Sequence, residues 1–105
     1  MICAKMLTRN GTLCGFDVQG HSGSAVSGQD IVCAAVSSAV YMAANTLTEV
    51  SGCKADIHEA DGLLTCTVCE ADTQKAQEVL KGLHIHFQGL SAQYPQFIKI
   101  QLTEV

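Results

Sequence analysis

The strongest constraint on the fold of this chain is a pair of dipeptides that end in glycine, Asn10-Gly11 and Asp61-Gly62. Each lies between two segments that alternate apolar and polar residues, as strands do. Such dipeptides favour the two-residue turns that connect antiparallel strands. The sequence therefore predicts one hairpin over residues 2–8 and 13–19, and a second over residues 54–60 and 63–69.

The first turn also predicts how its two strands pair. A two-residue turn places Cys14 opposite Leu7. In this register Cys14, Phe16 and Val18 form the face that we expect to join the core. Lys5 interrupts that face on the partner strand.

The second turn places Cys66 opposite Ile57 and Cys69 opposite Lys54. The spacing Cys66-x-x-Cys69 is also found in zinc sites. Residues three apart on a strand face opposite sides of the sheet, and the chain has no second such pair. We therefore interpret both thiols as packing residues and not as metal ligands or a redox pair.

A long apolar helix is predicted between the hairpins, from Asp30 to about residue 50, because apolar residues recur there at spacings of three and four. Asp30 is the predicted N-cap, and Gly52 the predicted stop. At 1.5 Å per residue the helix would be about 30 Å long, the width of a small domain. Its predicted buried stripe consists of Val32, Val36, Ala39, Ala43, Leu47 and Val50.

A second helix and a final strand complete the prediction. Asp72 or Thr73 would cap the helix, Pro95 follows it, and residues 97–103 alternate as a strand. The predicted class is α+β, with a single layer of mostly antiparallel sheet, two helices packed on it and the order ββαββαβ, in one domain spanning residues 1–105. The predicted buried stripe of the second helix consists of Ala76, Val79, Leu80, Leu83, Phe87 and Leu90.

The composition restricts the functional classes. The net charge is −4, with six Lys and Arg residues and no basic stripe, which disfavours direct nucleic-acid binding. No apolar run is expected to reach the length of a membrane span, and no signal-peptide core opens the chain, so we expect a cytoplasmic protein that does not bind membranes. The six cysteines are expected to be reduced thiols in that compartment.

Cys33 and His21 are the sharpest chemical signal in the chain. With Asp30 as the N-cap, Cys33 lies in the first helical turn, where the helix dipole and free N–H groups favour a thiolate. His21 lies on the preceding loop and can return to the thiol as general base and then as general acid. Asp30 is expected to cap the helix, with orientation of the imidazole as the alternative.

The same residues carry a family resemblance. Gly20-His21, followed by GQDIVCAAVS over residues 28–37, resembles the ribosomal-processing cysteine proteases called Prp. The resemblance implies that Cys33 and His21 are catalytic, and that the substrate is a large-subunit ribosomal protein whose short N-terminal extension is removed. It implies no metal and no organic cofactor, and it implies a homodimer.

The loop over residues 20–29 is rich in glycine and serine. Since it lies between the histidine and the thiol, we interpret it as a substrate loop, with an ordinary surface connection as the alternative. Its candidate contact residues are Gly20, Ser22, Gly23 and Gly28. Backbone N–H groups of the first helical turn are the expected oxyanion donors, with that of Cys33 as one candidate among them.

Two other functions are compatible with the sequence. One is a non-catalytic ribosome-assembly factor that binds a peptide in the same groove, and the other is a redox sensor that uses Cys33. A metal site is not indicated. His84 and His86 lie two apart on a predicted helix and so diverge by about 200°, and His58 has no neighbouring ligand in the sequence.

Overall fold

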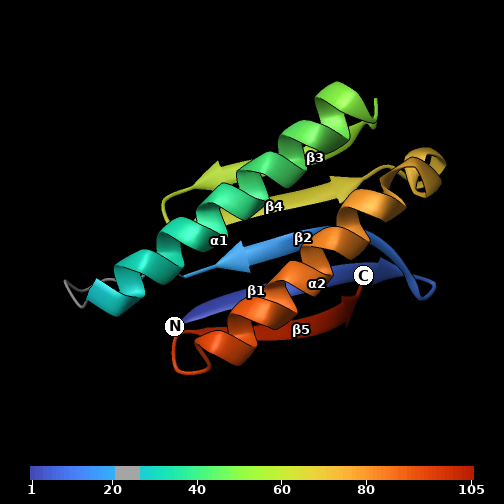
Figure 1. Ribbon diagram of the computed structural model, residues 1–105. Coiled ribbons are helices and arrows are strands. Elements are labelled where there is room, and N and C mark those ends of the chain that lie inside the picture. Colours follow the sequence, from blue (N-terminus) through green and yellow to red (C-terminus); the bar gives the residue numbers. More distant parts are fainter. Residues whose placement is uncertain (21–26) are drawn as a thin grey trace.

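A computed structural model describes residues 1–20 and 27–105, with residues 27–30 described by their backbone alone. It confirms the α+β class and the order ββαββαβ (Figure 1). The helices are α1 (Ser27–Asn45), which continues as a π-helical turn over Thr46–Val50, and α2 (Gln77–Gln93), which follows two 3-10 turns over Glu70–Asp72 and Gln74–Ala76. The strands are β1 (Ile2–Arg9), β2 (Thr12–Gln19), β3 (Ala55–Ala60), β4 (Leu63–Val68) and β5 (Ile98–Glu104).

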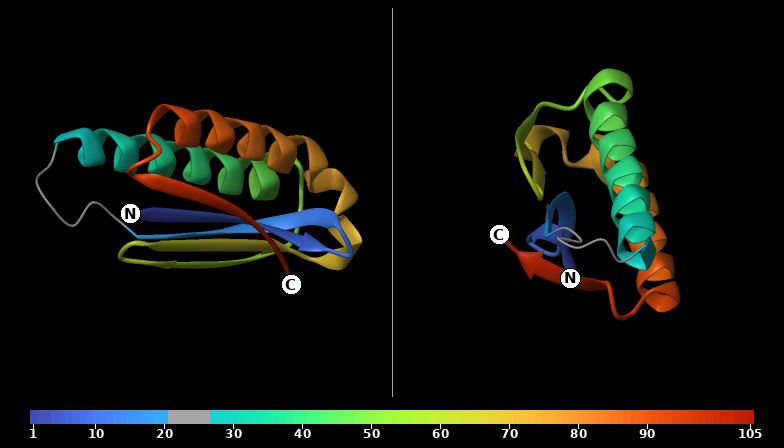
Figure 2. Two further views of the ribbon diagram at one scale, coloured as in Figure 1. Left: turned by 90° about the horizontal axis from the view of Figure 1, so that it is seen from below. Right: turned by 90° about the vertical axis from the view of Figure 1, so that its left-hand side faces the viewer.

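The strands form one sheet in the order β3-β4-β2-β1-β5. β1 and β5 run parallel, and the other neighbouring pairs are antiparallel. Both helices lie on the same face of the sheet (Figure 2). α1 lies nearer to β3 and β4, and α2 nearer to β1 and β5 (Figure 1). Each edge strand therefore has a different helix as its nearer one, and β3 stays largely exposed beside α1.

The core lies between the helices and the sheet. Val50 was predicted to join the α1 stripe, but it is 80% exposed, because the wider π-helical turn rotates it away from the sheet. Val40 and Ala44 are buried in the stripe instead. The predicted residues that are buried are Val32, Val36, Ala43 and Leu47 on α1, and Ala76, Leu80, Leu83, Phe87 and Leu90 on the second helix and the turn before it.

The first hairpin has the predicted turn but a different register. Asn10 and Gly11 have φ angles of 54° and 79°, both positive as a type I′ turn requires. A β-bulge then shifts the pairing, so that Leu7 faces Gly15 and the predicted pairing with Cys14 is wrong. Cys14 is fully buried, yet it lies outside the main core cluster.

This bulge removes the conflict that Lys5 posed. Met6 now faces Phe16, Ala4 faces Val18, and all four side chains belong to the core. Because neighbouring residues on a strand point to opposite faces, Lys5 falls on the face that carries no helix.

The second hairpin has the predicted register, with Ile57 opposite Cys66 and the Cys69 N–H donating to the carbonyl of Lys54 at 2.8 Å. The predicted cap is wrong for Asp72, which makes no capping hydrogen bond to α2. Its carboxylate accepts the Lys54 N–H at 2.8 Å and the Cys69 thiol at 3.2 Å. These bonds, the first above all, hold the pKa of Asp72 below its usual value.

α1 begins earlier than predicted. Its first residue is Ser27, so Gly28 and Asp30 lie inside the helix, and the prediction that Asp30 is the N-cap is wrong. The prediction relied on the capping preference of Asp30 alone, and the helix extends three residues further toward the N-terminus. The predicted end is confirmed, because Gly52 has a φ of 70°, the left-handed conformation that stops helices.

The segment Ile31–Val50 is 20 residues long with a mean hydropathy of 1.5. By length and composition it could cross a membrane, so the expectation that no segment reaches that length is wrong. In its most apolar part 33% of the residues are buried, and these pack on the sheet. The segment thus serves here as the core helix of the domain.

Candidate active site at the start of α1

Cys33 is partly buried and packs against the core from the second turn of α1. The sequence predicted the first turn. Because α1 begins at Ser27, Cys33 lies about 9 Å along the axis from the first helical residue. The free N–H groups of a helix are those of its first four residues, here 27–30. Oxyanion donors from the helix would therefore come from those residues, and not from Cys33 as predicted.

The helical geometry shows which flank of α1 carries the thiol. Val32 and Val36 face the sheet, and Cys33 is rotated by about 100° from Val32. Measured from Val36, Cys33 is rotated by about 60° and Tyr41 by about 140° in the same sense, and Tyr41 donates its hydroxyl proton to Glu59 of β3. Around the helix, Cys33 therefore lies between the sheet-facing stripe and Tyr41, on the flank of α1 that faces β3.

Gly20 determines where the chain leaves β2. Its N–H donates to the carbonyl of Gly62 at 2.9 Å, which joins the end of β2 to the turn between β3 and β4. Its φ is 97°, and a Cβ there would lie 2.3 Å from the carbonyl oxygen of Met1, so only glycine fits. The other predicted loop residues, His21, Ser22 and Gly23, lie outside the described residues.

The other thiols show how strongly burial suppresses ionisation in this fold. Burial raises the pKa of Cys66 to about 11 and raises those of Cys14 and Cys53. Cys69 donates to Asp72. All six cysteines are free, as expected. These four thiols therefore have structural surroundings, whereas Cys33 lies partly exposed on α1.

The described residues place no three His, Cys, Asp or Glu side chains where they could hold a metal ion. Among these residues Cys66 is buried in the core. His86 lies at a groove between α1 and α2, and His58 lies on the other face of the sheet.

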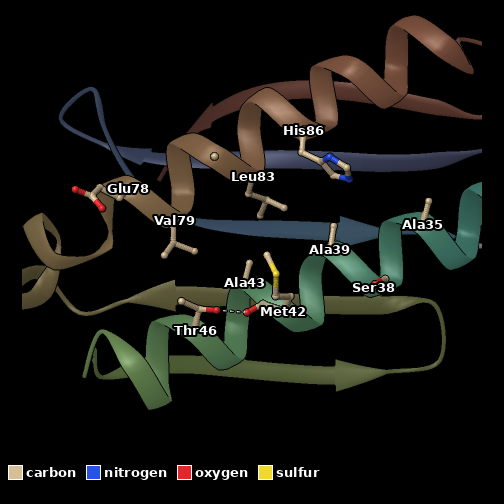
Figure 3. Close-up of a pocket in the computed structure, with 11 residues that line it drawn as sticks. Ala35, Ser38, Ala39, Met42, Ala43, Thr46, Glu78, Val79, Leu83 and His86 are labelled. Atoms are coloured by element: carbon tan, nitrogen blue, oxygen red, sulfur yellow. Dashed lines mark hydrogen bonds between the residues drawn. The ribbon is translucent and has the colours of Figure 1, made fainter.

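Sequence reasoning missed a groove between α1 and α2, because periodicity does not show how two helices lie beside each other, although Ala39, Ala43, Val79 and Leu83 of the predicted stripes line it. Its volume is about 770 Å³ (Figure 3). Small residues of both helices form its floor, and Met42 and His86 project at its sides. By the same helical geometry it lies on the flank of α1 opposite to Cys33. The lining residues are Ala35, Ser38, Ala39, Met42, Ala43, Thr46, Glu78, Val79, Gly82, Leu83 and His86.

Comparison with known proteins shows the family of this chain. The model of a family described as cysteine protease Prp matches residues 1–99. The ribosomal processing cysteine protease Prp of Bacillus subtilis (strain 168) is 29% identical over 91 residues, which cover 81% of each chain.

Two crystal structures have the same fold. SMU.848 from Streptococcus mutans is 27% identical with a TM-score of 0.81, and the match covers 100% of this chain and 96% of that one. An essential ribosomal processing protease Prp from S. aureus, in complex with a substrate peptide, is 21% identical with a TM-score of 0.87. That match covers 97% of this chain and 99% of the S. aureus chain.

Proposed function

Since the chain belongs to the cysteine protease Prp family and is a cysteine peptidase, we propose that Cys33 and His21 form its catalytic dyad. The supporting observation is the position of Cys33, a partly exposed thiol on the helix that follows the His21 loop. The loop runs from Gly20, which is bonded to the second hairpin, to Ser27, the first residue of α1. Six residues, 21–26, connect these two points.

The dyad would cleave a peptide bond in two steps. His21 takes the proton of the Cys33 thiol, and the thiolate attacks the scissile carbonyl. His21 then gives this proton to the leaving amine, and a thioester remains on Cys33. Water hydrolyses the thioester, which releases the acid and restores the thiol. Neither a metal nor an organic cofactor takes part in this scheme.

For the substrate we propose a large-subunit ribosomal protein in the cytoplasm, which loses a short N-terminal extension. The names of the B. subtilis and S. aureus relatives, both ribosomal processing proteases, support this choice. The net charge of −4 also favours encounter with a basic polypeptide.

The test is to incubate the purified protein with ribosomal proteins that carry native N-termini, and to map new termini by mass spectrometry. Cys33→Ala and His21→Ala should each abolish cleavage while substrate binding remains. Cys3→Ala is the matched control, because it removes another partly buried thiol. A non-catalytic assembly factor would instead keep full biological activity in Cys33→Ala, and that result would exclude the dyad.

We further propose that the protein forms a homodimer through the groove between α1 and α2. The groove is lined by small residues, and large apolar side chains project beside it, with Met42 65% and Ile85 69% exposed. A surface that carries both the projections and the hollows fits a second copy of itself about a two-fold axis. Cys33 would stay open to substrate, because it lies on the other flank of α1.

A further inference from the structure

We propose that the free edge of β3 binds the substrate as an added strand, and that this strand is a basic segment following the scissile bond. This proposal rests on the proposed function, since it concerns how the peptide reaches Cys33. β3 is the outermost strand on its side of the sheet, so its outer row of backbone N–H and C=O groups has no strand partner among the described residues. Such an edge binds extended peptides by backbone hydrogen bonds.

The edge of β3 lies on the same flank of α1 as the Cys33 thiol. β3 ends at the turn that contains Gly62, whose carbonyl accepts the N–H of Gly20. The substrate loop therefore starts beside the end of β3. Cys33 points toward the flank of α1 that faces this strand, and the bond from Tyr41 to Glu59 joins that flank to β3. The opposite flank of α1 faces the groove and α2 (Figure 3).

The direction of the bound chain follows from this geometry. The scissile carbonyl must lie near Cys33, at the carboxyl end of β3. Residues that follow the scissile bond and pair with β3 then run from its end toward its start, antiparallel to it. Antiparallel pairing is also slightly more stable per residue than parallel pairing.

Charge identifies the kind of strand. Residues 55–61 contain three exposed carboxylates, on Asp56, Glu59 and Asp61, and neither lysine nor arginine. The other edge strand, β5, differs, since it exposes Lys99 and its Glu104 accepts hydrogen bonds from Thr8 and Asn10. A basic extended segment is therefore attracted to β3 rather than to β5.

The first test uses a synthetic probe and the Cys33→Ala protein. A peptide of about ten alternating lysine and threonine residues, titrated into nitrogen-15-labelled protein, should shift the backbone amides of residues 55–61. The same peptide with glutamate in place of lysine should not shift them. Two N-methylated forms of the peptide separate the two sides of the strand, one methylated at the odd-numbered and one at the even-numbered residues. Alternate residues of a strand direct their N–H groups to the same neighbour, so one form should lose binding and the other should keep it. Amide shifts confined to other strands, or an equal effect of the two N-methylated peptides on binding, would overturn the proposal.

The second test measures the kinetics of cleavage in variants that retain Cys33. Reversing two edge charges in Asp56→Lys/Asp61→Lys should raise KM by about five- to tenfold at low salt, with kcat unchanged, and the difference should shrink as salt rises. Gln88→Lys/Gln96→Lys adds positive charge at two exposed positions of α2 and the turn after it, on the helix that lies nearer to β1 and β5, and should leave KM unchanged (Figure 1). An unchanged KM in the edge variant, with cleavage intact, would overturn the strand proposal and leave the protease function standing. Binding of the lysine peptide to β3 without any cleavage of ribosomal proteins would support the strand proposal and contradict the proposed function.

Discussion

At the scale of single residues, this fold places its six thiols in unequal surroundings. Burial raises the pKa of Cys66 to about 11 and acts in the same direction on Cys14 and Cys53. Ionisation is thus disfavoured at the buried positions, while Cys33 retains access to solvent. Burial thus removes three of the competing thiols, while selectivity over the partly buried Cys3 and Cys69 requires activation of the nucleophile itself.

This inequality predicts a labelling order. At pH 8, iodoacetamide should alkylate Cys33 well before Cys14, Cys53 and Cys66, because a buried protonated thiol is a poor nucleophile. Peptide mapping of the alkylated protein over time would measure the order. In concentrated urea all six thiols should react at similar rates. Early modification of Cys66 in the folded protein would contradict the burial argument.

Asp72 predicts a pH dependence of stability. Its pKa is lower in the folded than in the unfolded state, because its carboxylate accepts the Lys54 N–H and the Cys69 thiol. The stabilising effect is therefore complete above the unfolded pKa of about 4 and is lost as the pH falls through the folded pKa. Urea unfolding should show wild type more stable than Asp72→Asn at pH 7, with the gap closing toward pH 3. Glu70→Gln, which removes an exposed carboxylate nearby, should show no such gap at either pH.

At the scale of elements, close contact between β2 and β4 requires a glycine. A Cβ on Gly15 would lie 2.1 Å from the carbonyl oxygen of Cys66, which is backbone and cannot move aside. Gly15→Ala should destabilise the fold by about 2 kcal/mol or more, measured by urea unfolding. Gly89→Ala is the matched control on α2, where nothing lies within 4 Å, and it should stabilise by up to about 1 kcal/mol. Equal effects of the two substitutions would contradict the packing argument.

The elements also show what sequence could and could not predict. The turns, the sheet-facing stripe of α2 and the order of elements follow from local chemistry and periodicity, and they are confirmed. The bulge between Leu7 and Thr8 could not be predicted, because a turn fixes only the pairs beside it and the need to bury Met6 against Phe16 is a tertiary effect. The predicted start of α1 was wrong because it relied on the capping preference of Asp30, which lies inside the helix.

The candidate site was predictable in part. Cys33 was identified from its predicted place in the first helical turn and from its motif, and only the motif remains after the helix boundary is corrected, because Cys33 lies in the second turn. The groove between the helices could not be predicted, because it depends on how α1 and α2 lie beside each other. The same holds for the contact between Tyr41 and Glu59, which joins residues of two elements.

At the scale of the whole molecule, the two flanks of α1 separate two tasks. One flank carries Cys33 toward β3, and the other forms the groove toward α2. An apolar helix of mean hydropathy 1.5 that is only 33% buried in its most apolar part leaves much apolar surface to cover. A second copy seated in the groove would cover it and leave the approach to the thiol free.

This separation predicts a variant that dissociates the dimer without stopping the chemistry. Met42→Glu places a charge at the groove, where pairing with a second copy would bury it without a partner, so the dimer dissociation constant should rise about a hundredfold. Analytical ultracentrifugation would measure this change. Gln88→Glu adds the same charge to an exposed position of α2 away from the groove and should leave the dimer intact.

Cleavage provides the second readout of the same pair of variants. Because Cys33 and the β3 edge lie on the other flank of α1, monomeric Met42→Glu should keep kcat/KM within about twofold of wild type. A variant that stays dimeric would place the interface elsewhere on the molecule. A monomeric variant that loses cleavage while it remains folded would show that the two flanks are coupled, since the second copy would then be needed to shape the surroundings of Cys33.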